Sequence, residues 1–290
     1  MDGAKADRGA SDMSVTGPSR ERASRKTPLC FVGWGAIGQR VFELLEERAV
    51  PVELVAVGVR DASALRRTLP FGARLIADPG ELASTGASLV LEMAGKGSVL
   101  PWGEAALRAG ADFAVSSTSA FAEEGALETL RSIAQATGRQ ILIPPGALGG
   151  IDALAAASRL RLDAVTHRIV KPPLAWMGTG AEALCDLQGL TEPTVFFADT
   201  ARAAAAAFPQ NANVAVISSL AGIGLDRTHV VLVADPGLSR NIHEIHAEGE
   251  FGRLDVRVEN RPLADNPKSS ETTALNIVRL VENRVGAIAI

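Results

Sequence analysis

Four side chains of this sequence can exchange a proton near neutral pH, the imidazoles of His167, His229, His243 and His246. Residues 241–248 alternate as a β-strand does, which places His243 on an apolar face and His246 on the opposite, polar face. Because the two rings would point apart, we predict no metal site at this pair. The apolar surroundings of His243 fit a general acid–base group in a cleft and a buried core histidine equally well.

A second group of residues has the spacing of a phosphate-binding loop. Residues 33–38 read GWGAIG and lie between a predicted strand and a predicted amphipathic helix. In such a loop the first glycine permits a tight turn, the second lets a pyrophosphate approach, and the third lets the helix pack closely. The helix N-terminus then offers unpaired N–H groups to the phosphates. The predicted dinucleotide contacts of this loop are Gly33, Gly35, Ala36, Ile37 and Gly38.

The end of the next predicted strand should select between the two nicotinamide cofactors. An acidic residue there binds the ribose hydroxyls of NAD, whereas an arginine favours the 2′-phosphate of NADP. This chain has Arg60 followed by Asp61. The pattern does not fix which side chain faces the ribose, so we predict a site for NAD, NADP or both.

Three further polar residues are candidates for ligand contacts. Asn213 precedes an apolar helix, where an asparagine serves either as a helix cap or as a hydrogen-bond partner of the nicotinamide amide. Lys171 and Lys268 each stand beside proline-stiffened backbone. Two fixed cations suit a dianionic substrate, and the alternative is that both are solvated surface charges.

The elements that position the loop alternate between strand and helix. Apolar runs predict strands at residues 29–32, 52–59, 75–76, 88–93, 113–116 and 140–143. Helical patterns fall between them at residues 37–45, 102–109 and 123–137. This alternation predicts an α/β fold with a Rossmann-type, doubly wound parallel sheet.

After the Pro-Pro-Gly of residues 144–146 the pattern changes to longer alternating segments. Predicted strands occupy residues 164–171, 194–198, 228–234, 241–248 and 253–259, with an early helix at 151–159 and others near 200 and 214. We therefore expect a second α+β domain with a mixed sheet. The predicted division is a disordered extension at 1–26, a dinucleotide-binding domain at 27–146, a substrate domain at 147–266, and at 267–290 a helix that returns to the first domain.

Composition narrows the class of protein. Of 290 residues, 47% are hydrophobic and 21% charged, which is typical of a globular protein. The net charge of −4 lacks the basic excess of nucleic-acid-binding proteins, so no nucleic-acid partner is expected. No apolar stretch reaches about 18 residues, so no membrane span is expected. Two cysteines without metal-ligand spacing indicate a reducing, cytoplasmic location. An open, strand-rich sheet in the second domain favours a homodimer.

Taken together, the motifs resemble those of the L-aspartate dehydrogenase family from residue 28 to the end. The resemblance rests on GWGAIG at 33–38, IPPGALGGIDAL at 143–154, KPP at 171–173, FPQNANVA at 208–215, NIHEIHAEGEFG at 241–252 and NPKSS at 266–270. The segment GVRD at 58–61 departs from the family pattern, which leaves the cofactor preference open.

The resemblance implies a role for several residues. Ala147 and Asn213 correspond to nicotinamide-cofactor contacts, and His243 corresponds to the catalytic residue. The implied reaction is reversible oxidation of L-aspartate to iminoaspartate, followed by hydrolysis to oxaloacetate and ammonia, or release of the imine into nicotinamide-ring biosynthesis. Lys171 and Lys268 are then expected to bind the substrate carboxylates.

Two other functions fit the same fold. Homoserine dehydrogenases and dihydrodipicolinate reductases combine a nucleotide domain with a mixed-sheet domain, although the NIHEIH and NANVA segments count against them. A non-catalytic NAD(P)-binding sensor is the alternative from a different class, because a fold does not fix a function. Turnover of L-aspartate in the presence of NAD or NADP distinguishes these possibilities.

Overall fold

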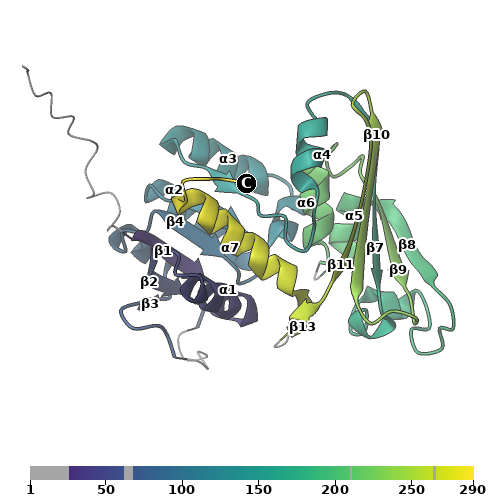
Figure 1. The fold of residues 1–290 in the computed structure, drawn as a ribbon, viewed down its shortest axis with the longest axis horizontal. Coiled ribbons are helices and arrows are strands. Elements are labelled where there is room, and N and C mark those ends of the chain that lie inside the picture. Colours follow the sequence, from purple (N-terminus) through teal and green to yellow (C-terminus); the bar gives the residue numbers. More distant parts are fainter. Residues whose placement is uncertain (1–25, 62–67, 210, 264–265) are drawn as a thin grey trace, which may run out of the picture.

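A six-stranded parallel sheet forms the first half of the fold (Figure 1). The computed structural model describes residues 26–290 apart from 62–67, 210 and 264–265, and it leaves out the side chains of Pro267 and Lys268. The strand order is β3-β2-β1-β4-β5-β6. The strands are β1 Thr27–Val32, β2 Val52–Gly58, β3 Arg74–Ile76, β4 Leu89–Glu92, β5 Asp112–Val115 and β6 Ile141–Leu142. Except for Lys26, the predicted extension lies outside the described residues.

Helices cover both faces of this sheet because its apolar strands are buried on both sides. On one face, α1 (Ala36–Glu47) and α7 (Glu271–Val285) pack on side chains such as Phe31 and Leu91. On the other face, α2 (Lys96–Arg108) and α3 (Ala126–Thr137) pack around Phe113. Two short 3₁₀ turns, η3 (Pro79–Ser84) and η4 (Thr118–Ala122), complete the layer.

Two predicted helix starts differ from the structure. Helix α2 begins at Lys96, ahead of the predicted residue 102, and contains Pro101. Helix α3 begins at Ala126 rather than 123, because Gly125 before it adopts a left-handed conformation with φ of 75°. Neither difference moves a predicted site residue.

The second half of the fold is a five-stranded mixed sheet in the order β11-β10-β7-β9-β8. Only the β7–β9 pair is parallel among its described ladders. The strands are β7 Leu162–Lys171, β8 Thr194–Thr200, β9 His229–Ala234, β10 Asn241–Gly249 and β11 Gly252–Asn260. The helices are α4 Ile151–Ala157, α5 Ala201–Ala207 and α6 Asn213–Ala221, with 3₁₀ turns η5 Pro173–Ala175 and η6 Gly180–Ala183. In Figure 1, α4 and α6 lie on the side of this sheet that faces the first sheet.

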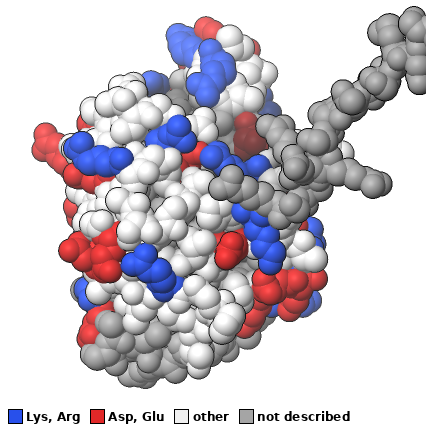
Figure 2. All heavy atoms as spheres, turned by 90° about the vertical axis from the view of Figure 1, so that its left-hand side faces the viewer, with Lys and Arg blue, Asp and Glu red and all other residues white. Residues whose placement is uncertain are grey.

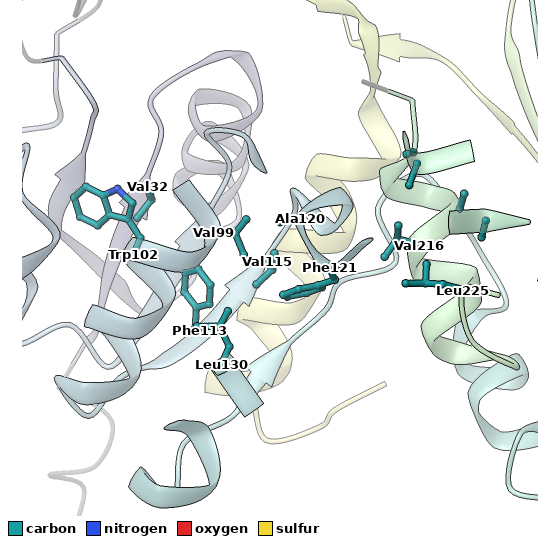
Figure 3. Close-up of a cluster of buried hydrophobic side chains, with 14 of the residues drawn as sticks. Val32, Val99, Trp102, Phe113, Val115, Ala120, Phe121, Leu130, Val216 and Leu225 are labelled. Atoms are coloured by element: carbon teal, nitrogen blue, oxygen red, sulfur yellow. The ribbon is translucent and has the colours of Figure 1, made fainter. Parts of the chain in front are cut away.

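The two halves share one hydrophobic core. A single buried cluster runs from Trp102 and Phe113 of the first half, through Phe121 of η4, to Val216 and Leu225 of the second half (Figure 3). Packing of this shared cluster therefore sets the position of the two sheets relative to each other.

The returning helix α7 follows a small hairpin of β12 (Pro262–Leu263) and β13 (Asn266–Ser270). Its apolar face, which includes Ile277 and Val281, joins the core between α1 and the first sheet. Near its end, Arg284 forms an ion pair with Asp112 of β5. Because α7 follows β13 and lies beside α1, this helix ties the end of the chain to the first half of the fold (Figure 1).

We expect Arg284→Met to destabilise the protein by about 1.5–3 kcal/mol, because it removes a charged partner of a buried carboxylate. Asp112 is 4% exposed and, among the described residues, would keep only the N–H of Gln140, which donates to it at 2.8 Å. Urea unfolding measures the loss. Arg48→Met is the control, since the Arg48–Glu282 pair is exposed and worth about 1 kcal/mol or less. Equal losses in the two variants would contradict a special role for the buried pair.

On the face shown in Figure 2, acidic and basic side chains are interspersed among the residues drawn in colour. None of the helices in the described part of the chain is long and apolar enough to cross a membrane.

Candidate active site

The glycine loop between β1 and α1 has three glycines with different surroundings. Gly33 has a positive φ of 99°, and a Cβ there would lie 2.9 Å from the backbone of Ala94. A Cβ on Gly38 would lie 2.7 Å from the carbonyl oxygen of Gly33. A Cβ on Gly35 would meet no atom within 4 Å among the described residues. The fold therefore requires Gly33 and Gly38, whereas Gly35 borders open space where a ligand can approach.

The N-terminus of α1 opens onto the same space. Gly35 is its N-cap, and no side chain caps the first turn among the described residues. Ala36 and Ile37 are the first two residues of the helix, so their N–H groups belong to the turn that has no partner within the helix. This is the arrangement that binds phosphate groups.

A buried carboxylate fixes the loops beside the glycine loop. Glu92, at the end of β4, is 1% exposed. Its Oε1 accepts the N–H groups of Ala94 and Gly95 at 2.8 Å each, and its Oε2 accepts the N–H of Ser117 at 2.9 Å. Sequence reasoning missed this residue. The available signal was an acid at the end of an otherwise apolar strand.

Arg60 and Asp61 lie just beyond the end of β2, and both are exposed. This end of β2 is beside the glycine loop, because the N–H of Gly33 donates to the carbonyl of Gly58 at 2.8 Å. Both candidates for the ribose selector are therefore in the expected place.

A cavity of about 120 Å³ lies between the two sheets and brings five of the predicted site residues together. Its lining includes Ile37, Ala147, Lys171, Asn213 and His243. Ser116, after β5, contributes from the end of the first sheet. The carboxyl end of a doubly wound sheet is the usual position for a nucleotide-dependent site.

His243 is 3% exposed and points from β10 toward the helix-covered side of the second sheet. Its Nδ1 is 3.3 Å from Nε2 of His167 on the neighbouring strand β7. Burial lowers the pKa of His243 well below its ordinary value, and the Lys171 ammonium lowers it further. The imidazole is therefore neutral at pH 7 and can accept a proton.

Lys171 ends β7 and is 7% exposed, so the surface-charge alternative for this lysine is wrong. Its Nζ donates to Oδ1 of Asn211 at 2.6 Å and lies 5.1 Å from the ring centre of Trp176. Burial lowers the pKa of Lys171 to about 8. Among the described residues no carboxylate lies within ion-pair distance of its ammonium. A buried cation of this kind favours an anionic ligand.

Asn213 is the first residue of α6, but it does not cap the helix, so that alternative is wrong. Instead its Oδ1 accepts the N–H of Ser119 at 2.9 Å, which connects α6 to η4. Since the side-chain oxygen is occupied, the amide nitrogen is the group left to donate to a ligand in the cavity.

Ala147 follows β6, and two asparagine side chains hold the backbone at this point. Its carbonyl accepts Nδ2 of Asn260 at 2.9 Å, and the carbonyl of Gly146 accepts Nδ2 of Asn276 at 2.8 Å. Lys268 lies in β13, and its side chain is outside the described residues. The neighbouring Ser269 and Ser270 line the cavity, so this segment does border the site.

The other histidines have different surroundings. His246 lies on the opposite face of β10 and pairs with Asp255 at 2.7 Å, so the prediction that it points away from His243 is confirmed. His229 is exposed at the start of β9. In the part of the chain that the structure describes, no three side chains of metal-binding type lie together.

The sequence matches two family models. Residues 152–284 match the model described as aspartate dehydrogenase, C-terminal, and residues 33–144 match the model described as homoserine dehydrogenase, NAD binding domain. The L-aspartate dehydrogenase of Brucella anthropi is 63% identical over 262 residues, which cover 90% of this chain and 98% of the relative. That of Ralstonia pickettii is 42% identical with the same two coverages.

Solved structures agree with these matches. The aspartate dehydrogenase of Thermotoga maritima has a TM-score of 0.73 at 25% identity, covering 91% of this chain and 99% of that one. A homoserine dehydrogenase from Thiobacillus denitrificans has a TM-score of 0.57 at 16% identity, covering 90% and 73%, which shows the shared fold alone. The predicted Rossmann-type sheet with a second mixed sheet is confirmed, and so is the resemblance. The chain belongs to the L-aspartate dehydrogenase family.

Proposed function

We propose that this chain is an NAD- or NADP-dependent L-aspartate dehydrogenase that converts L-aspartate to oxaloacetate and ammonia through iminoaspartate. The observation that supports this most directly is the cavity between the sheets, where a neutral imidazole and a buried ammonium lie beside the nucleotide side of the fold. We propose the domain division at 27–146, 147–266 and 267–290, with the cofactor bound by the first part and the substrate by the second.

The residues present fit a nicotinamide dinucleotide. The open space at Gly35 and the uncapped α1 N-terminus suit its pyrophosphate, and Arg60 or Asp61 would meet the adenosine ribose. The amide nitrogen of Asn213 and the fixed loop at Ala147 would hold the carboxamide end. When bound, the nicotinamide ring supplies the hydride acceptor.

We propose that Lys171 binds one substrate carboxylate and Lys268 the other. An ammonium already held by Asn211 and Trp176 needs little reordering to meet an anion. Lys171 and the imidazole of His243 line the same cavity, so a carboxylate on the lysine brings the amino-bearing carbon near the base.

His243 acts as the proton acceptor in this proposal. Its neutral ring takes a proton from the substrate ammonium, which frees the nitrogen lone pair that drives hydride loss from Cα. The imidazolium first releases this proton to solvent. The neutral ring then accepts a proton from the water that attacks the imine carbon and returns it to the nitrogen of the resulting carbinolamine, whose hydroxyl proton is lost as the carbonyl forms. Ammonia then leaves as the C–N bond breaks, and oxaloacetate remains.

Absorbance of the reduced nicotinamide tests this function with purified protein, L-aspartate, and NAD or NADP in parallel. We expect absorbance to rise with L-aspartate and not with homoserine, and the two initial rates rank the cofactors. Binding of the cofactor without turnover would favour the non-catalytic sensor. Turnover with homoserine alone would favour the homoserine-type enzyme.

Gly35→Val gives a test of the cofactor site by itself. The side chain would enter the space left open at Gly35, where φ of −84° is acceptable to any residue, so we expect an unchanged Tm and a loss of cofactor affinity of about 10-fold or more. Calorimetric titration with NAD and NADP measures the affinity. In the matched variant Gly38→Val the added side chain collides with the Gly33 carbonyl, so Tm itself should fall. Unchanged affinity in Gly35→Val would place the pyrophosphate elsewhere.

We further propose a homodimer in the cytoplasm. The face of the second sheet away from α4 and α6 has a groove of about 390 Å³ lined by paired charges, among them Arg168, Glu244 and Arg257. Such alternating charges can be complementary to a second copy of themselves. The two cysteines are free thiols, as a reducing compartment maintains them. Light scattering should give twice the chain mass, and a monomer mass would contradict the dimer.

A further inference from the structure

We propose that His167 and Ser218 are positioning residues that keep the proton of His243 on Nδ1, so that Nε2 of His243 is the unprotonated nitrogen at the cavity. This inference rests on the proposed function, in which His243 is the base. The three side chains come from β7, α6 and β10 and form a continuous hydrogen-bonded row.

The direction of the row follows from its buried end. The hydroxyl of Ser218 donates to the carbonyl of Ala215 at 3.0 Å, so its oxygen is left to accept from Nδ1 of His167 at 2.9 Å. A neutral imidazole has one N–H and one bare nitrogen. With the proton on Nδ1, Nε2 of His167 must accept, and the donor it meets at 3.3 Å is Nδ1 of His243.

His243 then has only one ring nitrogen left for chemistry. Because Nδ1 donates to His167, Nε2 bears the lone pair and serves as the proton acceptor. If the row ran in the opposite direction, Nε2 of His243 would bear hydrogen and could not accept a proton. The tautomer therefore decides whether this histidine is a base.

His167 and Ser218 cannot touch a ligand themselves. Both are fully buried, and neither lines the cavity. Burial lowers the pKa of His167 to about 3, with a smaller contribution from the Lys171 ammonium, so the ring stays neutral at any pH where the enzyme would work. A permanently neutral ring is a fixed hydrogen-bond acceptor rather than a second base.

The position of these residues is dictated by sheet register. His243 lies opposite Ile169, and His167 lies opposite Ile245, so the two rings are diagonal neighbours on one face of the antiparallel β7–β10 pair. Their ring centres are 5.5 Å apart. The titratable groups that act on this pair are each other and Lys171, and the polar group facing it from α6 is Ser218.

Substitution at His167 separates positioning from packing. His167→Gln keeps an acceptor near the place of Nε2, whereas His167→Leu fills similar space without one. We expect His167→Leu to lower kcat for L-aspartate by about 10–100-fold, as is typical when a supporting hydrogen bond is removed. KM and cofactor affinity should be unchanged, and His167→Gln should recover most of kcat. Equal kcat in the two variants would overturn the proposal.

The tautomer itself can be measured without turnover. The ¹⁵N spectrum of histidine-labelled wild-type protein, assigned with His167→Gln and His243→Asn, reports which ring nitrogen is protonated. We expect Nδ1–H for both His167 and His243, and Nε2–H on His243 would overturn the proposal. Ser218→Ala should weaken this preference and lower kcat, which keeps the test open if His167→Leu fails to fold. If the spectrum shows the expected tautomers but the protein does not oxidise L-aspartate, the proposed function is wrong. The hydrogen-bonded row of Ser218, His167 and His243 is then still supported.

Discussion

Replacing His243 with asparagine should lower kcat for L-aspartate oxidation by about 10²–10⁴-fold, the usual loss of an acid–base group. Asparagine can still donate a hydrogen bond to Nε2 of His167 from about the position of Nδ1, so the buried row and the fold should survive. What disappears is the bare nitrogen that accepts the proton. Cofactor affinity should be unchanged, because the proposed cofactor contacts at Gly35, Asn213 and Ala147 do not involve the side chain of His243.

Steady-state kinetics and calorimetric titration with the cofactor measure the two parts of this prediction. His229→Asn is the matched control, since that histidine is exposed at the start of β9. Turnover near the wild-type rate in His243→Asn would exclude this residue as the base. An equal loss in both variants would point to a general effect of histidine replacement rather than to chemistry at His243.

Much of the fold could be predicted because its strands are continuous apolar runs and its turns are marked by glycine and proline. The strand at residues 29–32 and the helix after GWGAIG follow directly from these patterns. Helix α2 was predicted too short, because Pro101 reads as a helix boundary although the chain is already helical from Lys96. The short β12–β13 hairpin has too few residues for a periodic pattern.

The site was less predictable, for a physical reason. Within the glycine motif, Gly38 packs against the carbonyl of Gly33, only five positions earlier in the chain. The partner of His243 is His167, 76 residues earlier, and only the register of β7 against β10 brings them together. Asn211, which holds Lys171, likewise depends on tertiary packing. Such tertiary contacts cannot be inferred from the composition of the sequence or from the spacing of its motifs.

The buried ammonium connects substrate binding with the state of the base. Lys171 lies close enough to both imidazoles to lower the pKa of each. At neutral pH it offers the positive charge in the cavity that a carboxylate needs, and it also disfavours a second positive charge on His243. One residue therefore attracts the anion and keeps the base neutral.

Lys171→Met should raise KM for L-aspartate by about 10–100-fold, because it removes a charge-assisted hydrogen bond of about 1.5–3 kcal/mol. Methionine keeps an apolar stem against Trp176, so cofactor affinity and Tm should change little. The variant should also raise the pKa of His243, since the ammonium no longer lowers it. The acidic limb of the kcat profile should then move to higher pH.

In the wild type the same lysine predicts a rise of KM at alkaline pH. With a pKa of about 8, Lys171 loses its charge as the pH increases through that value, and the carboxylate loses its partner. Lys171→Met should lack this rise, whereas Lys26→Met, at an exposed lysine before β1, should retain it. A KM that is independent of pH in the wild type, or equal in Lys171→Met and Lys26→Met, would assign the substrate carboxylate to a different cation.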